Sequence, residues 1–144
     1  MTAAPAAARP AAQRDLAQML ASLEVAQRAG EYVFVASPQH DPALAALAHA
    51  SVREDEGASY VLARADADAR ALDYGFVAAW LSLTVHSALD AVGLTAAVSS
   101  ALSERGIACN VIAGLHHDHL LVPAERAADA VAALAALRRP ADAL

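Results

Sequence analysis

The order of apolar patterns in the second half of the chain restricts the fold more than any other feature of the sequence. A strand pattern is followed by a helical pattern, two further strand patterns and a second helical pattern. We predict strands over Ala78–Val85, Ile107–Ala113 and His119–Val122, and helices from Leu94 to Gly106 and over Ala124–Leu137. Each helix has a single apolar face, so both helices are expected on one side of an antiparallel sheet.

This β-α-β-β-α order is a ferredoxin-like α+β arrangement that lacks its last strand. Residues 138–144 include two adjacent arginines and a proline, which do not suit a strand. We therefore expect a strand from the first half of the chain to complete the sheet. The two candidates are Tyr32–Ala36 and Ser59–Ala63, which are rich in β-branched and aromatic residues.

The first half of the chain has weaker patterns. Residues 1–11 contain alanine clusters broken by two prolines and are predicted to form a disordered tail. Leucine and methionine residues recur at helical spacing from Leu16 to Leu23, which predicts a helix of about four turns that ends before Gly30. Asp41 and Pro42 are typical of a helix start, and we expect that helix to continue through Ala50.

The rest of the first half predicts a hairpin and one ambiguous segment. Ser51–Arg53 and Ser59–Ala63 flank an acidic turn over Glu54–Gly57, and Asp66–Leu72 is compatible with a short helix or a loop. No proline-rich linker separates the two halves. We therefore predict a first unit over residues 12–75 and a second over residues 76–140, packed against each other.

Composition excludes several classes of protein. The net charge is -6 and the arginines are scattered, which disfavours binding to nucleic acid. The apolar run Phe76–Val85 is too short to span a membrane, and no hydrophobic leader segment is visible near the start. The single cysteine, Cys109, cannot form an internal disulfide. These features predict a cytoplasmic protein without membrane or nucleic-acid partners.

The loop that precedes the second-half helix is the first candidate site. Gly93 allows a tight backbone turn, and the helix that follows exposes N–H groups that attract a carboxylate. Asn110, on the next predicted strand, offers a side-chain amide that both donates and accepts hydrogen bonds. Ordinary turn chemistry at Asp90 and Gly93 explains the same residues without any ligand.

The sequence of this loop resembles the signature of the ACT domain. Asp90 and the Gly93-Leu94 pair lie just before a helix, as in that family, although Val92 stands where the family often has proline. Gly106–Ile112 and the final helix are similar to the aspartate-kinase and CASTOR type of ACT domain. Over residues 14–137 the chain resembles small bacterial proteins that contain two ACT-like units.

This resemblance implies two ferredoxin-like βαββαβ units per chain, a regulatory role without catalytic activity, and possible homodimers. It also implies a small-molecule effector, such as an amino acid, but no cofactor. Carried over position by position, the effector-binding residues are Asp90, Val92, Gly93, Leu94, Thr95, Asn110, Val111 and Ile112. The segment after Ile112 departs from the serine- and threonine-rich segment of the aspartate-kinase type, so no particular amino acid is implied.

Histidines near this region raise the question of a metal site. His116, His117, Asp118 and His119 are metal-binding residue types, but successive residues of a strand face opposite sides. We therefore predict no metal site, and a polar hairpin network is the alternative explanation of these residues. Secondary effector contacts are predicted at four residues: His86, Glu54, His117 and His119.

No catalytic constellation is apparent in the sequence. His86 and Ser87 are neighbours on the chain and would point in opposite directions on a strand, which argues against a Ser-His-Asp hydrolase. The leading hypothesis is a regulatory protein that binds an amino acid or a similar small molecule. The alternative is a structural or protein-interaction module without a ligand.

Overall fold

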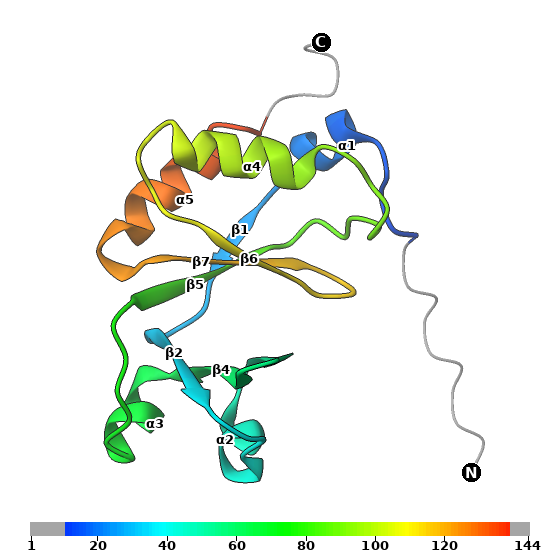
Figure 1. The fold of residues 1–144 in the computed structure, drawn as a ribbon. Coiled ribbons are helices and arrows are strands. Elements are labelled where there is room, and N and C mark those ends of the chain that lie inside the picture. Colours follow the sequence, from blue (N-terminus) through cyan, green and yellow to red (C-terminus); the bar gives the residue numbers. More distant parts are fainter. Residues whose placement is uncertain (1–10, 139–144) are drawn as a thin grey trace, which may run out of the picture.

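The computed structural model describes residues 11–138, so most of the predicted disordered tail lies outside the described residues. Figure 1 shows strands in the middle of the molecule, with α1, α4 and α5 on one side and α2 and α3 on the other. The helices are α1 Leu16–Ala21, α2 Pro42–Leu47, α3 Arg64–Ala69, α4 Leu94–Ser103 and α5 Ala127–Ala135, with a 3-10 turn over Ala124–Arg126. The strands are β1 Val25–Gln27, β2 Tyr32–Ser37, β3 Ala50–Glu54, β4 Gly57–Ala63, β5 Val77–Leu83, β6 Asn110–Ala113 and β7 Asp118–Pro123.

All described strands belong to one antiparallel sheet in the order β3-β4-β2-β5-β7-β6. Strand β1 also pairs with β5, on the edge where β2 pairs. We refer to β2, β3 and β4 as the first half-sheet and to β1, β5, β6 and β7 as the second. This α+β, ferredoxin-like arrangement confirms the predicted fold class.

A strand from the first half of the chain does pair with the second half-sheet, as predicted: the candidate Tyr32–Ala36 is confirmed in part, and the unpredicted strand β1 adds most of the pairs. Val25–Gln27 pairs with Leu81–Leu83 over three residues, whereas Tyr32 and Val33 add only two pairs at the start of β5. The candidate Ser59–Ala63 was wrong, because β4 pairs with β2 and β3 instead.

The predicted four-turn helix before Gly30 was also wrong. Helix α1 ends at Ala21, where the backbone N–H of Ser22 donates to the Gln18 carbonyl at 3.1 Å. The chain then extends, and Leu23 is buried in the core. Local periodicity favours a longer helix, but pairing with the free edge of β5 stabilises an extended segment instead.

Other boundaries also differ from the prediction. Helix α2 begins as predicted, with the Asp41 carboxylate accepting from the N–H groups of Ala43 and Leu44, but it ends at Leu47 because Ala50 pairs with Val61. The predicted strand Ile107–Ala113 begins only at Asn110. The predicted helix Ala124–Leu137 consists of the 3-10 turn and α5. Helix α3 begins two residues before the ambiguous segment Asp66–Leu72 and includes the first part of it.

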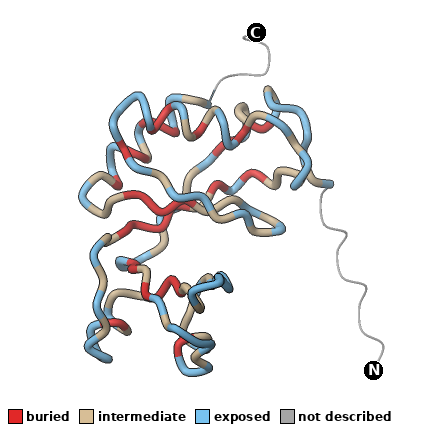
Figure 2. Tube along the Cα trace, viewed as in Figure 1, coloured by how far each residue is buried: buried red, intermediate tan, exposed pale blue. Residues whose placement is uncertain are grey.

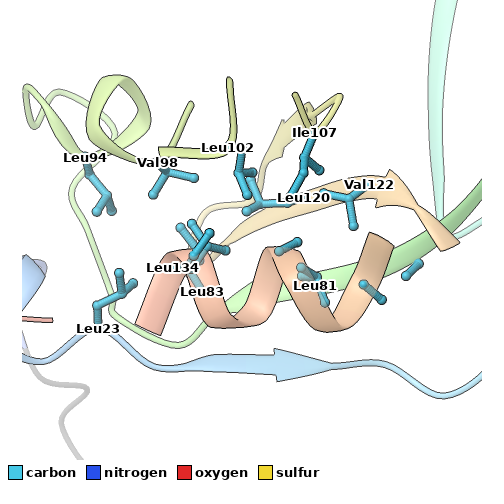
Figure 3. Close-up of a cluster of buried hydrophobic side chains, with 14 of the residues drawn as sticks. Leu23, Leu81, Leu83, Leu94, Val98, Leu102, Ile107, Leu120, Val122 and Leu134 are labelled. Carbon is cyan, nitrogen blue, oxygen red and sulfur yellow. The ribbon is translucent and has the colours of Figure 1, made fainter. Parts of the chain in front are cut away.

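Side chains between the helices and the sheet form two separate cores. The larger core packs α1, α4 and α5 against the second half-sheet, and Figure 3 shows Leu23, Leu94, Val98 and Leu134 converging there. The smaller core packs α2 and α3 against the first half-sheet. Figure 2 shows buried residues along the strands and on one side of the helices. Helix α1 and strand β1 belong to the predicted first unit, yet they pack with the second half-sheet around the larger core. The division into two units at residue 75 therefore stays a prediction.

A third apolar cluster lies on the opposite face of the sheet, which the helices do not cover and which we call the inner face. It contains Tyr32 and Val61 from the first half-sheet and Ala78, Trp80 and Leu121 from the second. The inner faces of the two half-sheets therefore pack against each other. Within the described residues, no helix is long and apolar enough to cross a membrane.

Candidate ligand-binding site

Gly93 determines the backbone path at the start of α4. It is the N-cap of α4 with φ of 109°, a region that L side chains rarely adopt, and no side chain caps the helix. A Cβ atom at this position would lie 2.9 Å from Leu16 Cδ2 of α1. Glycine is therefore favoured mainly by the backbone angle, because the Leu16 methyl group lies at the end of a flexible side chain that can move.

A pocket of about 140 Å³ lies beside this helix start. Gly93, Leu94 and Thr95 form one wall, and Ser87 and Asp118 contribute to the others. The Ser87 hydroxyl donates to the Asp118 carboxylate at 3.3 Å. The pocket thus combines the positive end of a helix dipole with a carboxylate, a pairing that suits a ligand bearing both a carboxylate and an ammonium group.

The first segment of the chain covers part of this region. The Gln13 N–H donates to the His86 carbonyl at 2.8 Å, and the Ala88 N–H donates to the Gln13 carbonyl at 2.8 Å. Arg14 and Asp90 form an exposed ion pair with 3.1 Å between nitrogen and oxygen. The loop before α4 is therefore held in place by the residues that lead into α1.

The structure divides the predicted effector-binding residues between two cavities and the exposed surface. Gly93, Leu94 and Thr95 line the pocket described above. Asp90 is not among its lining residues and pairs with Arg14, while the side chain of Val92 is 83% exposed. The predicted contacts on the next strand line a different cavity: Asn110, Val111 and Ile112.

That second cavity, of about 400 Å³, lies between the inner faces of the two half-sheets. Phe34 and Val61 line it from the first half-sheet, and Ile112 lines it from the second. Strands β3 and β6 are the two ends of the sheet order, yet both contribute lining residues. The sheet is therefore curled enough to bring its two edges to the same cavity.

The predicted secondary contacts lie in different surroundings. The rings of His86 and His116 are 5.5 Å apart, and those of His116 and His117 are 6.5 Å apart, in the region of the pocket beside α4. His119 instead lies on the inner face, where its Nδ1 accepts a hydrogen bond from Trp80 Nε1 at 3.1 Å. Glu54 accepts from Ser59 in the β3–β4 hairpin and lines neither cavity.

Two further observations concern reactive groups. Burial raises the pKa of the Cys109 thiol, which favours its neutral form. Among residues 11–138, no group of three or more His, Cys, Asp or Glu side chains is arranged to hold a metal ion.

Sequence reasoning did not assign Ser87 or Asp118 to the ligand site. Asp118 pairs with Ala113 across the β6–β7 hairpin, and both line the pocket beside α4. Recognition of the hairpin register would have placed Asp118 beside Ala113, because the start of β7 lies next to the end of β6, but it would not have placed Asp118 beside Ser87.

Comparison with known proteins identifies the fold family. An ACT-domain family model matches residues 11–79, and a second ACT-domain model matches residues 76–136. Among curated proteins, none matches the sequence.

Solved structures show the same fold. A Vibrio cholerae protein of unknown function, described as a possible transport protein, is 38% identical with a TM-score of 0.78, and the match covers 86% of this chain and 96% of that one. An Agrobacterium tumefaciens protein is 23% identical over 81% of this chain and 89% of that one, with a TM-score of 0.65. The ligand-free regulatory subunit of aspartate kinase from Thermus thermophilus is 13% identical over 83% of this chain and 99% of that one, with a TM-score of 0.60. With two ACT-domain models matched in succession along its sequence, the chain belongs to the ACT-domain family.

Proposed function

We propose that this chain is a regulatory protein that binds a small effector, an amino acid, in the pocket beside the start of α4. Membership of the ACT-domain family supports a regulatory ligand-binding role in general terms. The observation that carries the finer proposal is the pairing of the Gly93 helix start with the Asp118 carboxylate in one pocket. The proposal gives the protein no catalytic activity of its own and no cofactor.

The chemistry of the pocket matches the two charges of a free amino acid. The α-carboxylate is placed against the first N–H groups of α4, which have no partners within the helix. The ammonium group is placed toward Asp118, whose carboxylate keeps lone pairs beyond the one used by Ser87. A pocket of about 140 Å³ favours a small effector side chain.

The surface beside the pocket supports a protein partner as well. Leu89, Val92 and Leu115 are large apolar side chains that are exposed by 68%, 83% and 67%, respectively. Leu89 also lines the pocket. A second copy of the chain placed over these residues would form the predicted homodimer, and this observation also favours the second candidate function, an interaction module without an effector.

A thermal-shift screen with the standard amino acids tests the proposal. An effector present at 100 times its Kd stabilises the protein by about 2.7 kcal/mol, because it binds only the folded chain. The Asp118→Asn variant removes the charge that faces the ammonium group, so the shift given by the same amino acid is expected to decrease strongly. The matched control Asp73→Asn removes an exposed carboxylate outside the pocket and is expected to retain the full shift.

Two results would contradict this proposal. One is the absence of a shift with every amino acid at millimolar concentration, which would leave the interaction module as the better account. The other is an equal shift in wild type and in Asp118→Asn, which would place the effector elsewhere on the protein.

A further inference from the structure

The inner face contains a cluster of aromatic and imidazole rings that joins the two half-sheets. Tyr32 lies on β2, and its ring centroid is 5.3 Å from that of Trp80 on β5. The His49 ring, just before β3, is 5.2 Å from Tyr32 and 6.0 Å from Trp80. The His119 ring on β7 is 5.4 Å from Trp80. Each histidine thus contacts Trp80 from a different half-sheet.

Arg28, between β1 and β2, adds a charge to this cluster. Its guanidinium carbon lies 4.1 Å from the centroid of the Trp80 ring, which is a cation–π contact. Arg28 Nη1 also lies 3.1 Å from His49 Nδ1, and the Arg28 backbone N–H donates to the Trp80 carbonyl at 2.9 Å. We call Arg28, His49, Trp80 and His119 the inner-face cluster.

The donors in this cluster assign a role to the Nδ1 atom of each histidine. A guanidinium has only donors, so His49 Nδ1 must accept from Arg28. The indole N–H of Trp80 also only donates, so His119 Nδ1 must accept from it. The Ser82 hydroxyl oxygen also lies 2.8 Å from this nitrogen, whose single lone pair the indole N–H and the hydroxyl share. Nδ1 is therefore the acceptor in both contacts, and in His119 it accepts from the buried Trp80 indole.

The charges near His119 act mainly against its protonation. Burial is the largest cause that lowers the pKa of His119, followed by the positive charge of Arg28 and by His117, while Asp118 acts in the opposite direction. The other ring nitrogen, Nε2, lies close to the backbone of Gly114, because a Cβ atom added to Gly114 would lie 3.2 Å from it. The nearby Tyr32 hydroxyl donates to the Ala29 carbonyl and is not bonded to either histidine.

We propose that His119 forms an acid-sensitive latch that holds Trp80 in the packing between the two half-sheets, closed while the His119 imidazole is neutral. A proton on His119 Nδ1 occupies the lone pair that accepts from Trp80 Nε1. Protonated His119 therefore leaves the indole N–H without this acceptor. The change weakens the packing of Trp80, which is 2% exposed and contacts Tyr32 of the first half-sheet.

The direction of the pH dependence follows from the lowered pKa of His119. The unfolded chain binds a proton at the ordinary value of 6.5, whereas the folded chain does so only at lower pH. Stability from the closed latch is therefore complete above 6.5 and is lost as the pH falls from 6.5 through the lowered value. This latch does not depend on the proposed effector.

Trp80 is the only tryptophan in the chain and reports directly on the latch. The test follows the single indole N–H resonance and acrylamide quenching of Trp80 fluorescence between about pH 8 and about pH 5. We expect the indole resonance to move and the quenching constant to rise several-fold, while the far-UV circular dichroism spectrum is unchanged. Constant values over this range would overturn the proposal, as would simultaneous loss of the circular dichroism signal.

An asparagine variant shows whether His119 causes this change. In His119→Asn the side-chain oxygen can accept the same hydrogen bond but does not titrate. The variant is expected to abolish the change in quenching. The control His40→Asn alters an exposed histidine outside the cluster and is expected to titrate like wild type. An unchanged rise in quenching in His119→Asn would refute the latch.

Discussion

At the residue scale, Gly57 shows how closely two backbone segments approach in this fold. It begins β4 with φ of 137°, and a Cβ atom at this position would overlap the Ser37 carbonyl oxygen and lie 2.8 Å from the Pro38 carbonyl carbon. Because those atoms belong to the backbone, no side-chain movement can relieve the contact. The sequence indicates a hairpin turn at Gly57, but the approach of residues 37–38 is visible only in the structure.

We predict that Gly57→Ala destabilises the protein by more than about 4 kcal/mol, since backbone strain and overlap add together. Gly30→Ala is the matched control, because Gly30 also has positive φ, of 86°, but has no atom within 4 Å of an added Cβ. The control is expected to cost about 1–2 kcal/mol. Urea unfolding followed by circular dichroism measures both, and equal losses would contradict the predicted approach at Gly57.

Asp41 and Asp118 show which residue roles can be predicted from sequence. The cap at Asp41 depends only on neighbours up to three positions away, and the predicted role is confirmed. Asp118 contacts Ser87, 31 positions earlier in the chain, through the folding of the β6–β7 hairpin onto the loop before α4. No local pattern indicates such a contact.

At the element scale, β1 is the element that sequence patterns missed. A strand of three residues contains too little alternation to be distinguished from the end of a helix. The apolar spacing from Leu16 to Leu23 is real, but Leu23 reaches the core from the segment between α1 and β1. Residues 25–27 are extended because they pair with the edge of β5, a strand more than 50 positions away in the sequence.

Proline substitutions test the pairing of β1. The Thr84 N–H donates to Glu24, and the Arg28 N–H donates to Trp80, so Ala26 occupies the hydrogen-bonded position opposite Ser82. Ala26→Pro removes a bond to β5 and is expected to cost about 3 kcal/mol or more.

The control for this prediction is Gln27→Pro, which alters the next residue of β1. Its N–H points away from β5, so the loss of stability is expected to be clearly smaller than in Ala26→Pro. Chemical denaturation compares the two variants. A larger loss in Gln27→Pro would contradict the assigned register.

At the scale of the whole molecule, the curl of the sheet determines how the predicted site is divided. Figure 1 shows the helices of the two half-sheets on opposite sides, with the strands between them. The resemblance of residues 90–95 and 110–112 to one family motif predicts a single site. In the structure β6 contributes Ala113 to the pocket beside α4 and Asn110 to the cavity between the half-sheets. The relative position of distant elements therefore decides which predicted residues meet.

The central claim is that the effector binds beside the start of α4. The most direct measurement is the change in backbone amide resonances when each standard amino acid is added to the isotopically labelled full chain. We predict that one or a few amino acids shift the resonances of Gly93, Leu94 and Thr95 most, together with that of Asp118. Resonances that stay constant with every amino acid, or shifts confined to Asn110–Ile112, would contradict the claim.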